Sequence, residues 1–192
     1  SGVPEFATVL RNDGSVATTT GETTTTNLAV FTSGQYNRYP KSLWTTASNV
    51  GSEVIDGRTI YRGDIVYGGF GWIYPTARAT TNSYVIIRFL ISSGIYITST
   101  GTLYVYDQYL TPTTLGTTTG TVPLNQWSFV AAWINTVDEE LIISINGTQE
   151  SFDLSSVTGW GSETSQTGAF AYRSYNGLDS YMSEVGSFYD YD

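Results

Sequence analysis

The stretch NQWSFVAAWINTVDEELIISINGT, residues 125–148, decides the fold of this chain. Residues 127–134 and 141–145 are rich in β-branched and aromatic side chains, and a polar segment separates them. Such runs predict two antiparallel strands joined by a turn, and Asn146-Gly147 predicts a tight turn after them. Because both faces of the first strand are apolar, we expect it to lie inside a β-sandwich.

The tryptophans of this first strand are expected to be core residues. Trp127, Phe129 and Trp133 recur with the period of two that places side chains on one strand face. Large rings bury much apolar surface between two sheets. Trp133→Ala is therefore expected to lower the free energy of unfolding by roughly 3–5 kcal/mol.

Outside this hairpin the sequence predicts further strands. Residues 84–91 are almost continuously apolar and predict a central strand, whereas Pro and Gly in residues 111–120 predict a loop or an edge strand. Glycines around Phe70 predict a bulge or a bend, and Thr100-Gly101 predicts a hinge between two strands. The other expected strands are residues 54–60, 64–67, 95–99, 103–108, 169–173 and 182–189.

Length and composition restrict the class of protein. The chain has 192 residues, 40% of them hydrophobic and 13% charged, with a net charge of −9. It contains no Cys and no His, which excludes disulfides, thiol catalysis and Ser-His-Asp triads. The acidic balance argues against nucleic acid and against anionic membrane surfaces as partners. We expect no nucleic-acid binding and no membrane insertion.

The N-terminal segment bears on the domain boundaries. Residues 1–6, SGVPEF, resemble a cloning remnant, with neither the basic nor the apolar region of a signal peptide. We therefore expect residues 7–192 to form a single domain that is part of a larger surface protein or particle.

The hairpin also resembles a known family. The pattern N-x-W-x-x-V-A, an acidic turn and then L-x-I-x-I-N-G is similar to the laminin-G-like, concanavalin A-like lectin-glucanase jelly-roll superfamily. Residues 177–179, 184–185 and 189–190 are similar to the closing segment of that group. The resemblance covers residues 84–191 and implies an all-β, antiparallel β-sandwich of jelly-roll type. The residues of the hairpin that carry it are Asn125, Trp127, Val130, Ala131, Leu141, Ile143, Ile145, Asn146 and Gly147.

The sequence lacks the catalytic residues that enzymes of this superfamily use. Glycosidases of this superfamily carry E-x-D-x-x-E on one strand, which this sequence lacks. Glu53 and Asp56 are three residues apart, which places them on opposite strand faces, and residues 138–140 are expected in a turn. Polysaccharide lyases of this fold use a His, which is absent here. We expect no enzyme activity.

Acidic residues are also the candidates for a metal site. Calcium prefers six to eight oxygen ligands, and acids cluster only at residues 138–140 and at Asp179, Asp190 and Asp192. Without the spaced Asp and Asn ligands of metal-dependent lectins, these acids are interpreted as solvated turn residues. We expect neither a metal nor another cofactor.

Aromatic residues are abundant where charges are few, which favours carbohydrate or receptor binding. Flat rings stack on sugar C–H faces, while Asn, Arg and Tyr bind the polar edges. Rings flanked by glycine, in residues 70–74 and 159–161, are expected to point outward from loops. Trp160-Gly161-Ser162-Glu163 is similar to the galectin W-G-x-E platform, but it follows the hairpin instead of preceding it and the galectin His is absent. We interpret this match as a coincidence and still expect Trp160 to be an exposed platform. The predicted ligand-binding residues are Trp72, Tyr74, Arg78, Trp160, Tyr172, Arg173, Tyr175 and Asn176. Arg78 and Arg173 are candidate partners for the carboxylate of an acidic sugar such as sialic acid, and solvated surface arginines are the alternative interpretation.

The sequence thus predicts a non-catalytic module that binds a glycan or a cell-surface glycoprotein receptor. Its Thr-, Tyr- and Gly-rich composition, with a single lysine at Lys41, favours a viral or phage spike, fibre or protrusion, in an extracellular or virion-surface location. Two alternatives stay open: a structural or oligomerisation domain, and a glycan-active hydrolase. Asn146-Gly147-Thr148 is also a glycosylation sequon, which the tight turn explains equally well.

Overall fold

The computed structural model describes residues 6–9, 30–32, 42–45, 50–60, 65–78, 84–90, 93–160, 166–174 and 180–191. Every regular element in these ranges is a strand, and none of them contains a helix able to cross a membrane. The strands are β1 Phe6–Val9, β2 Val30–Thr32, β3 Ser42–Thr45, β4 Val50–Ile60, β5 Ile65–Pro75, β6 Tyr84–Leu90, β7 Ser93–Ile97, β8 Thr102–Asp107, β9 Thr114–Thr121, β10 Ser128–Asn135, β11 Glu140–Ile145, β12 Thr148–Asp153, β13 Gln166–Ser174 and β14 Ser180–Tyr191.

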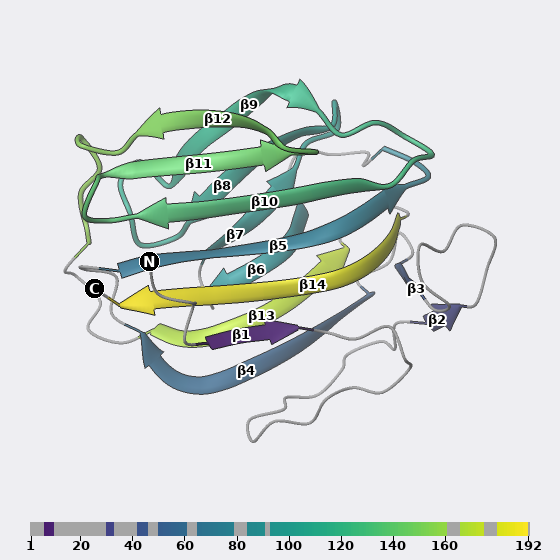
Figure 1. Ribbon diagram of the computed structural model, residues 1–192, viewed down its shortest axis with the longest axis horizontal. Coiled ribbons are helices and arrows are strands. Elements are labelled where there is room, and N and C mark those ends of the chain that lie inside the picture. The colour runs from purple at the N-terminus through teal and green to yellow at the C-terminus, as the bar shows by residue number, and fades with distance from the viewer. Residues whose placement is uncertain are drawn as a thin grey trace.

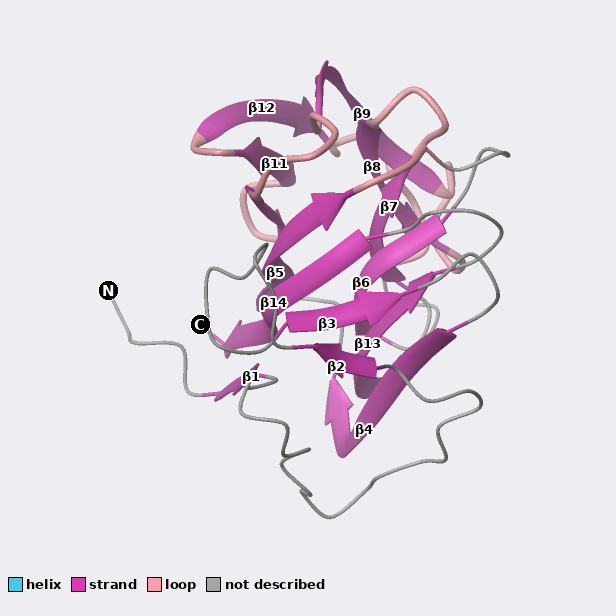
Figure 2. Ribbon diagram, turned by 90° about the vertical axis from the view of Figure 1, so that its right-hand side faces the viewer, coloured by secondary structure: helices cyan, strands magenta, loops and turns pink. Residues whose placement is uncertain are grey.

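The described strands form two antiparallel sheets that lie face to face (Figures 1 and 2). The eight-stranded sheet has the order β12-β11-β10-β5-β14-β3-β2, with β1 also paired to β14. The six-stranded sheet has the order β4-β13-β6-β7-β8-β9. This arrangement confirms the predicted all-β antiparallel sandwich. The expected central position of residues 84–91 and the expected edge position of residues 111–120 are also confirmed, since β6 lies between β13 and β7 and β9 ends its sheet.

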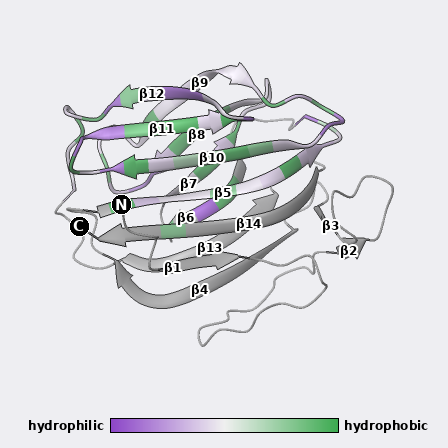
Figure 3. Cartoon of the chain, viewed as in Figure 1, coloured by the Kyte–Doolittle hydropathy of each residue, from purple (hydrophilic) through white to green (hydrophobic). Residues whose placement is uncertain are grey.

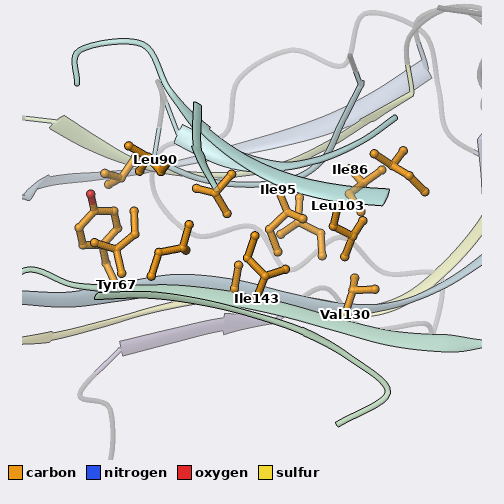
Figure 4. Close-up of a cluster of buried hydrophobic side chains, with 14 of the residues drawn as sticks. Tyr67, Ile86, Leu90, Ile95, Leu103, Val130 and Ile143 are labelled. Atoms are coloured by element: carbon orange, nitrogen blue, oxygen red, sulfur yellow. The ribbon is translucent and has the colours of Figure 1, made fainter. Parts of the chain in front are cut away.

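Aliphatic side chains from both sheets meet in one core (Figure 4). Val130 and Ile143 come from the eight-stranded sheet, while Ile95 and Leu103 face them from the six-stranded sheet, and all four have no exposed surface. Burying one such side chain contributes about 1.5–3 kcal/mol to folding. The core is therefore built mainly from Ile, Leu and Val.

The aromatic side chains of β10 lie on the outer face of the sheet instead. Val130, Ala132 and Ile134 are fully buried, whereas Phe129 and Trp133 are half-buried on the opposite face, and Trp127 is half-buried just before the strand. The prediction that Trp127 and Trp133 fill the inter-sheet core is wrong. Both faces of the strand are apolar, so alternation alone does not tell which face points inward.

Strand β5 continues without interruption through the glycines that were expected to bend the chain. Gly68 is paired with Trp133 on β10 and with Phe188 on β14. A Cβ atom at Gly68 would lie 2.2 Å from the Ala132 carbonyl oxygen and 2.8 Å from Trp133 Cβ. Glycine therefore allows a close approach of β5 and β10 here. The strand does not break at these glycines, but its pairing with β14 shifts register opposite Phe70 and Trp72, which agrees with the bulge that was expected as the alternative to a bend.

At one edge of the sandwich, where β9 and β12 are the last strands of their sheets, a carboxylate links the two strands. Glu150 on β12 accepts hydrogen bonds from the backbone N–H groups of Thr119, at 2.9 Å, and Gly120, at 3.0 Å. These bonds lower the pKa of Glu150. Strand β12 is hydrophilic over most of its length (Figure 3), as expected of an edge strand.

Candidate functional site

Five aromatic side chains lie together on the outer face of the eight-stranded sheet: Phe70, Trp72, Tyr74, Trp127 and Phe129, here called the aromatic band. Trp72 is directly opposite Phe129 in the pairing of β5 with β10, and their ring centroids are 5.3 Å apart in an edge-to-face arrangement. Tyr74 and Trp127 form a second edge-to-face pair at 5.6 Å. All five rings keep part of their surface exposed, because the core takes the alternate residues of both strands.

Exposed amide side chains border the aromatic band. Asn125 and Gln126 precede Trp127, and the Asn125 N–H donates to the Pro75 carbonyl oxygen at 2.8 Å, which ties this turn to the end of β5. Asn146 lies on the other side, where its Oδ1 accepts from the Phe129 N–H at 2.8 Å. Asn146 and Gly147 have φ angles of 52° and 86°, so the predicted tight turn is confirmed. The band therefore combines flat apolar surfaces with polar groups at its border.

Trp72 and Tyr74 thus belong to one surface, although the secondary structure around them differs from the prediction. Residues 70–74 were expected to form a loop, whereas both side chains project from β5. Trp127 and Phe129 were not among the predicted ligand-binding residues, because they were assigned to the core. The signal that could have found them is the shared period of two in residues 70–74 and 127–133, which two paired outward faces produce.

Arg78 lies three residues beyond the end of β5, with its guanidinium over the turn between β7 and β8. A Cβ atom at Gly101 would lie 2.2 Å from Arg78 Nη1. The Val122 N–H donates to the Gly101 carbonyl oxygen at 2.8 Å, and the same segment reaches Pro75 through Asn125. Backbone hydrogen bonds thus connect the turn below Arg78 with the end of β5 that carries Tyr74.

Trp160 lies elsewhere and is packed against the core. It is half-buried, and the segment before it pairs with the β8–β9 connection through Thr158 and Thr111. Because β8 runs from Thr102 to Asp107, this connection is at the opposite end of β8 from Gly101. The expectation that Trp160 points outward as a loop platform is wrong, since the ring covers core residues at one end of the sandwich.

The remaining predicted residues are not joined to this surface by the described structure. Tyr172 and Arg173 lie in β13 of the six-stranded sheet, where they pair with Ser52 and Gly51 of β4, and their side chains are outside the described part. Tyr175 and Asn176 lie outside the described residues.

A second aromatic group lies on the outer face of the six-stranded sheet and consists of Tyr96, Tyr104 and Tyr106, here called the tyrosine cluster. Tyr96 stacks on Tyr104 at 5.1 Å and contacts Tyr106 edge to face at 5.5 Å. Burial raises the pKa of Tyr96 to about 12, although nearby Arg88 opposes this shift. The alternation of residues 103–106 predicted that Tyr104 and Tyr106 share a face. Tyr96 joins them because it pairs directly with Tyr104.

Acidic side chains in the described part serve local structure. Asp107 is buried and accepts hydrogen bonds from Ser93 Oγ and from the Tyr109 N–H. Asp138 accepts from Asn135 Nδ2 at 2.6 Å, and Glu140 accepts from Ser151 Oγ at 2.5 Å. Among the described residues no group of three or more acidic side chains is arranged to hold a metal ion. Glu53 and Asp56 both lie in β4, and their side chains are outside the described part.

No family model and no curated protein matches the sequence. Solved structures of similar fold include the binding domain of botulinum neurotoxin DC in complex with SialylT (16% identity, TM-score 0.60, 94% of this chain and 47% of that chain). They also include the cellulose induced protein Cip1 (11%, 0.58, 83% and 84%) and Trypanosoma rangeli sialidase in complex with sialic acid (10%, 0.55, 82% and 27%).

These similarities establish the β-sandwich fold, and at such low identities they establish the fold alone. The chain spans less than half the length of the toxin and sialidase chains. The sugars named with those two structures are therefore ligands of longer proteins, one of which is a sialidase.

Proposed function

We propose that this chain is a non-catalytic module that binds carbohydrate through the aromatic band. The observation that carries the proposal is the two part-exposed ring pairs, Trp72–Phe129 and Tyr74–Trp127, bordered by exposed amides. Aromatic faces pack against the C–H faces of pyranose rings, and amide groups form hydrogen bonds with sugar hydroxyls. A sugar held in this way needs neither a metal ion nor a catalytic carboxylate.

We further propose that the module belongs to a larger surface protein, such as a viral or phage spike, fibre or protrusion. Its partner would be a glycan or a cell-surface glycoprotein receptor, and its location the outside of a cell or virion. The support is compositional, because the chain has no Cys and a single lysine among eight basic residues while Tyr and Gly are abundant.

The test is a glycan array probed with the wild-type chain and with Trp72→Ala, Trp127→Ala and Tyr104→Ala. The last variant removes a half-buried outward ring from the other sheet and is the matched control. Wild type should bind at least one class of glycan and release no reducing sugar from it. Loss of Trp72 or Trp127 should weaken binding by about 10- to 100-fold, as for aromatic hot spots.

The alternatives predict different results from the same samples. A structural or oligomerisation domain would bind no glycan, and the two band variants would change its oligomeric state in size-exclusion chromatography. A hydrolase would release reducing sugar. Binding that survives both band substitutions but is lost with Tyr104→Ala would contradict the proposed site and place it on the tyrosine cluster.

A further inference from the structure

Arg78 occupies space that only a glycine leaves open. Gly101 has a φ of +92°, and a Cβ atom there would lie 2.2 Å from Nη1 and 2.5 Å from Cζ of Arg78. The guanidinium therefore rests directly on the backbone of the β7–β8 turn. Any side chain at this position would displace it.

One nitrogen of this guanidinium is buried and unsatisfied. Nη1 of Arg78 has no hydrogen-bond partner in the part of the chain that the structure describes. Burial also lowers the pKa of Arg78, although arginine stays charged at any physiological pH. A buried cationic donor without an acceptor is unfavourable for the free protein and needs an explanation.

Hydroxyl groups surround the same turn. Thr98 Oγ1 lies 2.8 Å from Thr100 Oγ1 and 2.7 Å from Thr102 Oγ1. Thr100 is exposed, and hydroxyls of this kind can donate to an anion as well as accept from a sugar. The turn is linked through Val122 and Asn125 to the end of the aromatic band.

We infer that Arg78 binds the carboxylate of an acidic sugar whose pyranose rings lie on the aromatic band. This inference rests on the proposed function and names its ligand class, a carboxylate-bearing glycan. Nη1 itself is enclosed, but the Arg78 side chain is partly exposed, so a carboxylate can accept hydrogen bonds from the N–H groups that remain accessible. A bound anion also compensates the charge that the fold leaves unpaired. The eight-stranded sheet would supply the rings, and Arg78, whose guanidinium lies over the β7–β8 turn, would supply the charge.

The experiment measures affinity for 3′-sialyllactose, for lactose as its neutral parent, and for 3′-sulfated lactose. Wild type, Arg78→Gln, Arg78→Lys and the control Arg88→Gln are compared, the last removing a half-buried arginine near the tyrosine cluster. Wild type should prefer sialyllactose over lactose by at least tenfold. Arg78→Gln should remove 10- to 100-fold of the sialyllactose affinity and leave lactose binding unchanged, since a charge-assisted pair is lost.

The other samples show which part of the proposal fails if the expected preference is not found. Arg78→Lys should restore only part of the preference, because lysine keeps the charge but lacks the fork. Equal binding of lactose and sialyllactose by wild type would overturn the inference while the proposed function stands. A preference for sulfated lactose over sialyllactose would overturn the carboxylate in favour of a sulfate ester. No binding of any glycan on the array would overturn both.

A structural role for Arg78 predicts a different readout. If the guanidinium stabilised the turn, Arg78→Gln would lower the melting temperature in the absence of sugar. Because its buried donor is unsatisfied, we expect the melting temperature of Arg78→Gln to equal or exceed that of wild type. A clear drop in melting temperature with an unchanged sugar preference would overturn the inference.

Discussion

Trp133 and Ile134 are consecutive residues on opposite faces of β10. Ile134 is fully buried between the sheets, whereas Trp133 is half-buried on the outer face. Removing Ile134 leaves a cavity that the packed core closes only in part, so Ile134→Ala should cost about 2–5 kcal/mol of unfolding free energy. Trp133→Ala leaves no enclosed cavity and should cost less, about 2 kcal/mol, from the part of the ring that is shielded from water.

Urea denaturation of both variants beside wild type provides the measurement, with the unfolding free energy taken from the linear extrapolation. Far-UV circular dichroism of the folded proteins is the control. A larger loss for Trp133→Ala than for Ile134→Ala would contradict the assignment of the faces, and with it the place of the aromatic band.

At the level of strands, the contact between β12 and β9 includes one ionised side chain beside the Phe152 ring that packs on Gly116. Glu150 accepts two backbone N–H groups of β9, and these bonds stabilise its charged form and lower its pKa below the ordinary value of 4.5. Their contribution is fully present above pH 4.5 and is lost as the pH falls through the lower folded-state pKa. Because the carboxylate is largely exposed to solvent, we expect about 1 kcal/mol or less at pH 7.

Thermal unfolding of wild type and Glu150→Gln between pH 3 and pH 7 measures this contribution. The variant should be less stable near neutral pH. The difference should shrink as the pH falls below 4.5 and through the lowered folded-state pKa of Glu150, where the wild-type side chain also becomes neutral. Asp138→Asn, in the β10–β11 turn, is a control for loss of one charge without loss of the sheet contact. A difference that stays constant down to pH 3 would show that Glu150 does not act through its charge.

The sequence predicted strand positions well where a hydrophobic run and the turn residues beside it indicated the same strand boundaries. Strands β6, β8, β10 and β11 were expected close to where they occur, and the Asn146-Gly147 turn was expected with its conformation. The full length of strand β5 was not expected, because glycines usually interrupt strands. At Gly68 the neighbouring strands lie so close that only glycine fits, and this reason is visible only in three dimensions.

On the scale of the molecule, the predicted site residues fall in several places. Trp72 and Tyr74 lie on the eight-stranded sheet, Arg78 lies over the β7–β8 turn, and Trp160 packs at the other end of β8. Composition indicated that aromatic residues are abundant where charges are few. Which of them gather on one face depends on strand pairing between residues 55 or more positions apart, and a single sequence contains no direct signal for that pairing.

The two outer faces differ in chemistry. The eight-stranded sheet presents Trp and Phe rings beside amides, and the six-stranded sheet presents tyrosines near Arg88. Aromatic rings with polar groups at their border are expected where a ligand has both apolar faces and polar edges. The position of the bound sugar on the molecule is therefore the central claim.

The five tryptophans allow that claim to be tested directly, because each indole N–H gives one signal in a nitrogen–proton correlation spectrum. Single Trp→Phe substitutions assign the signals, and the glycan bound most tightly on the array is then titrated into wild type. We expect the indole signals of Trp72 and Trp127 to shift with the binding curve, while that of Trp160 stays in place. A saturating titration that moves the Trp160 signal and leaves those of Trp72 and Trp127 unchanged would contradict the account.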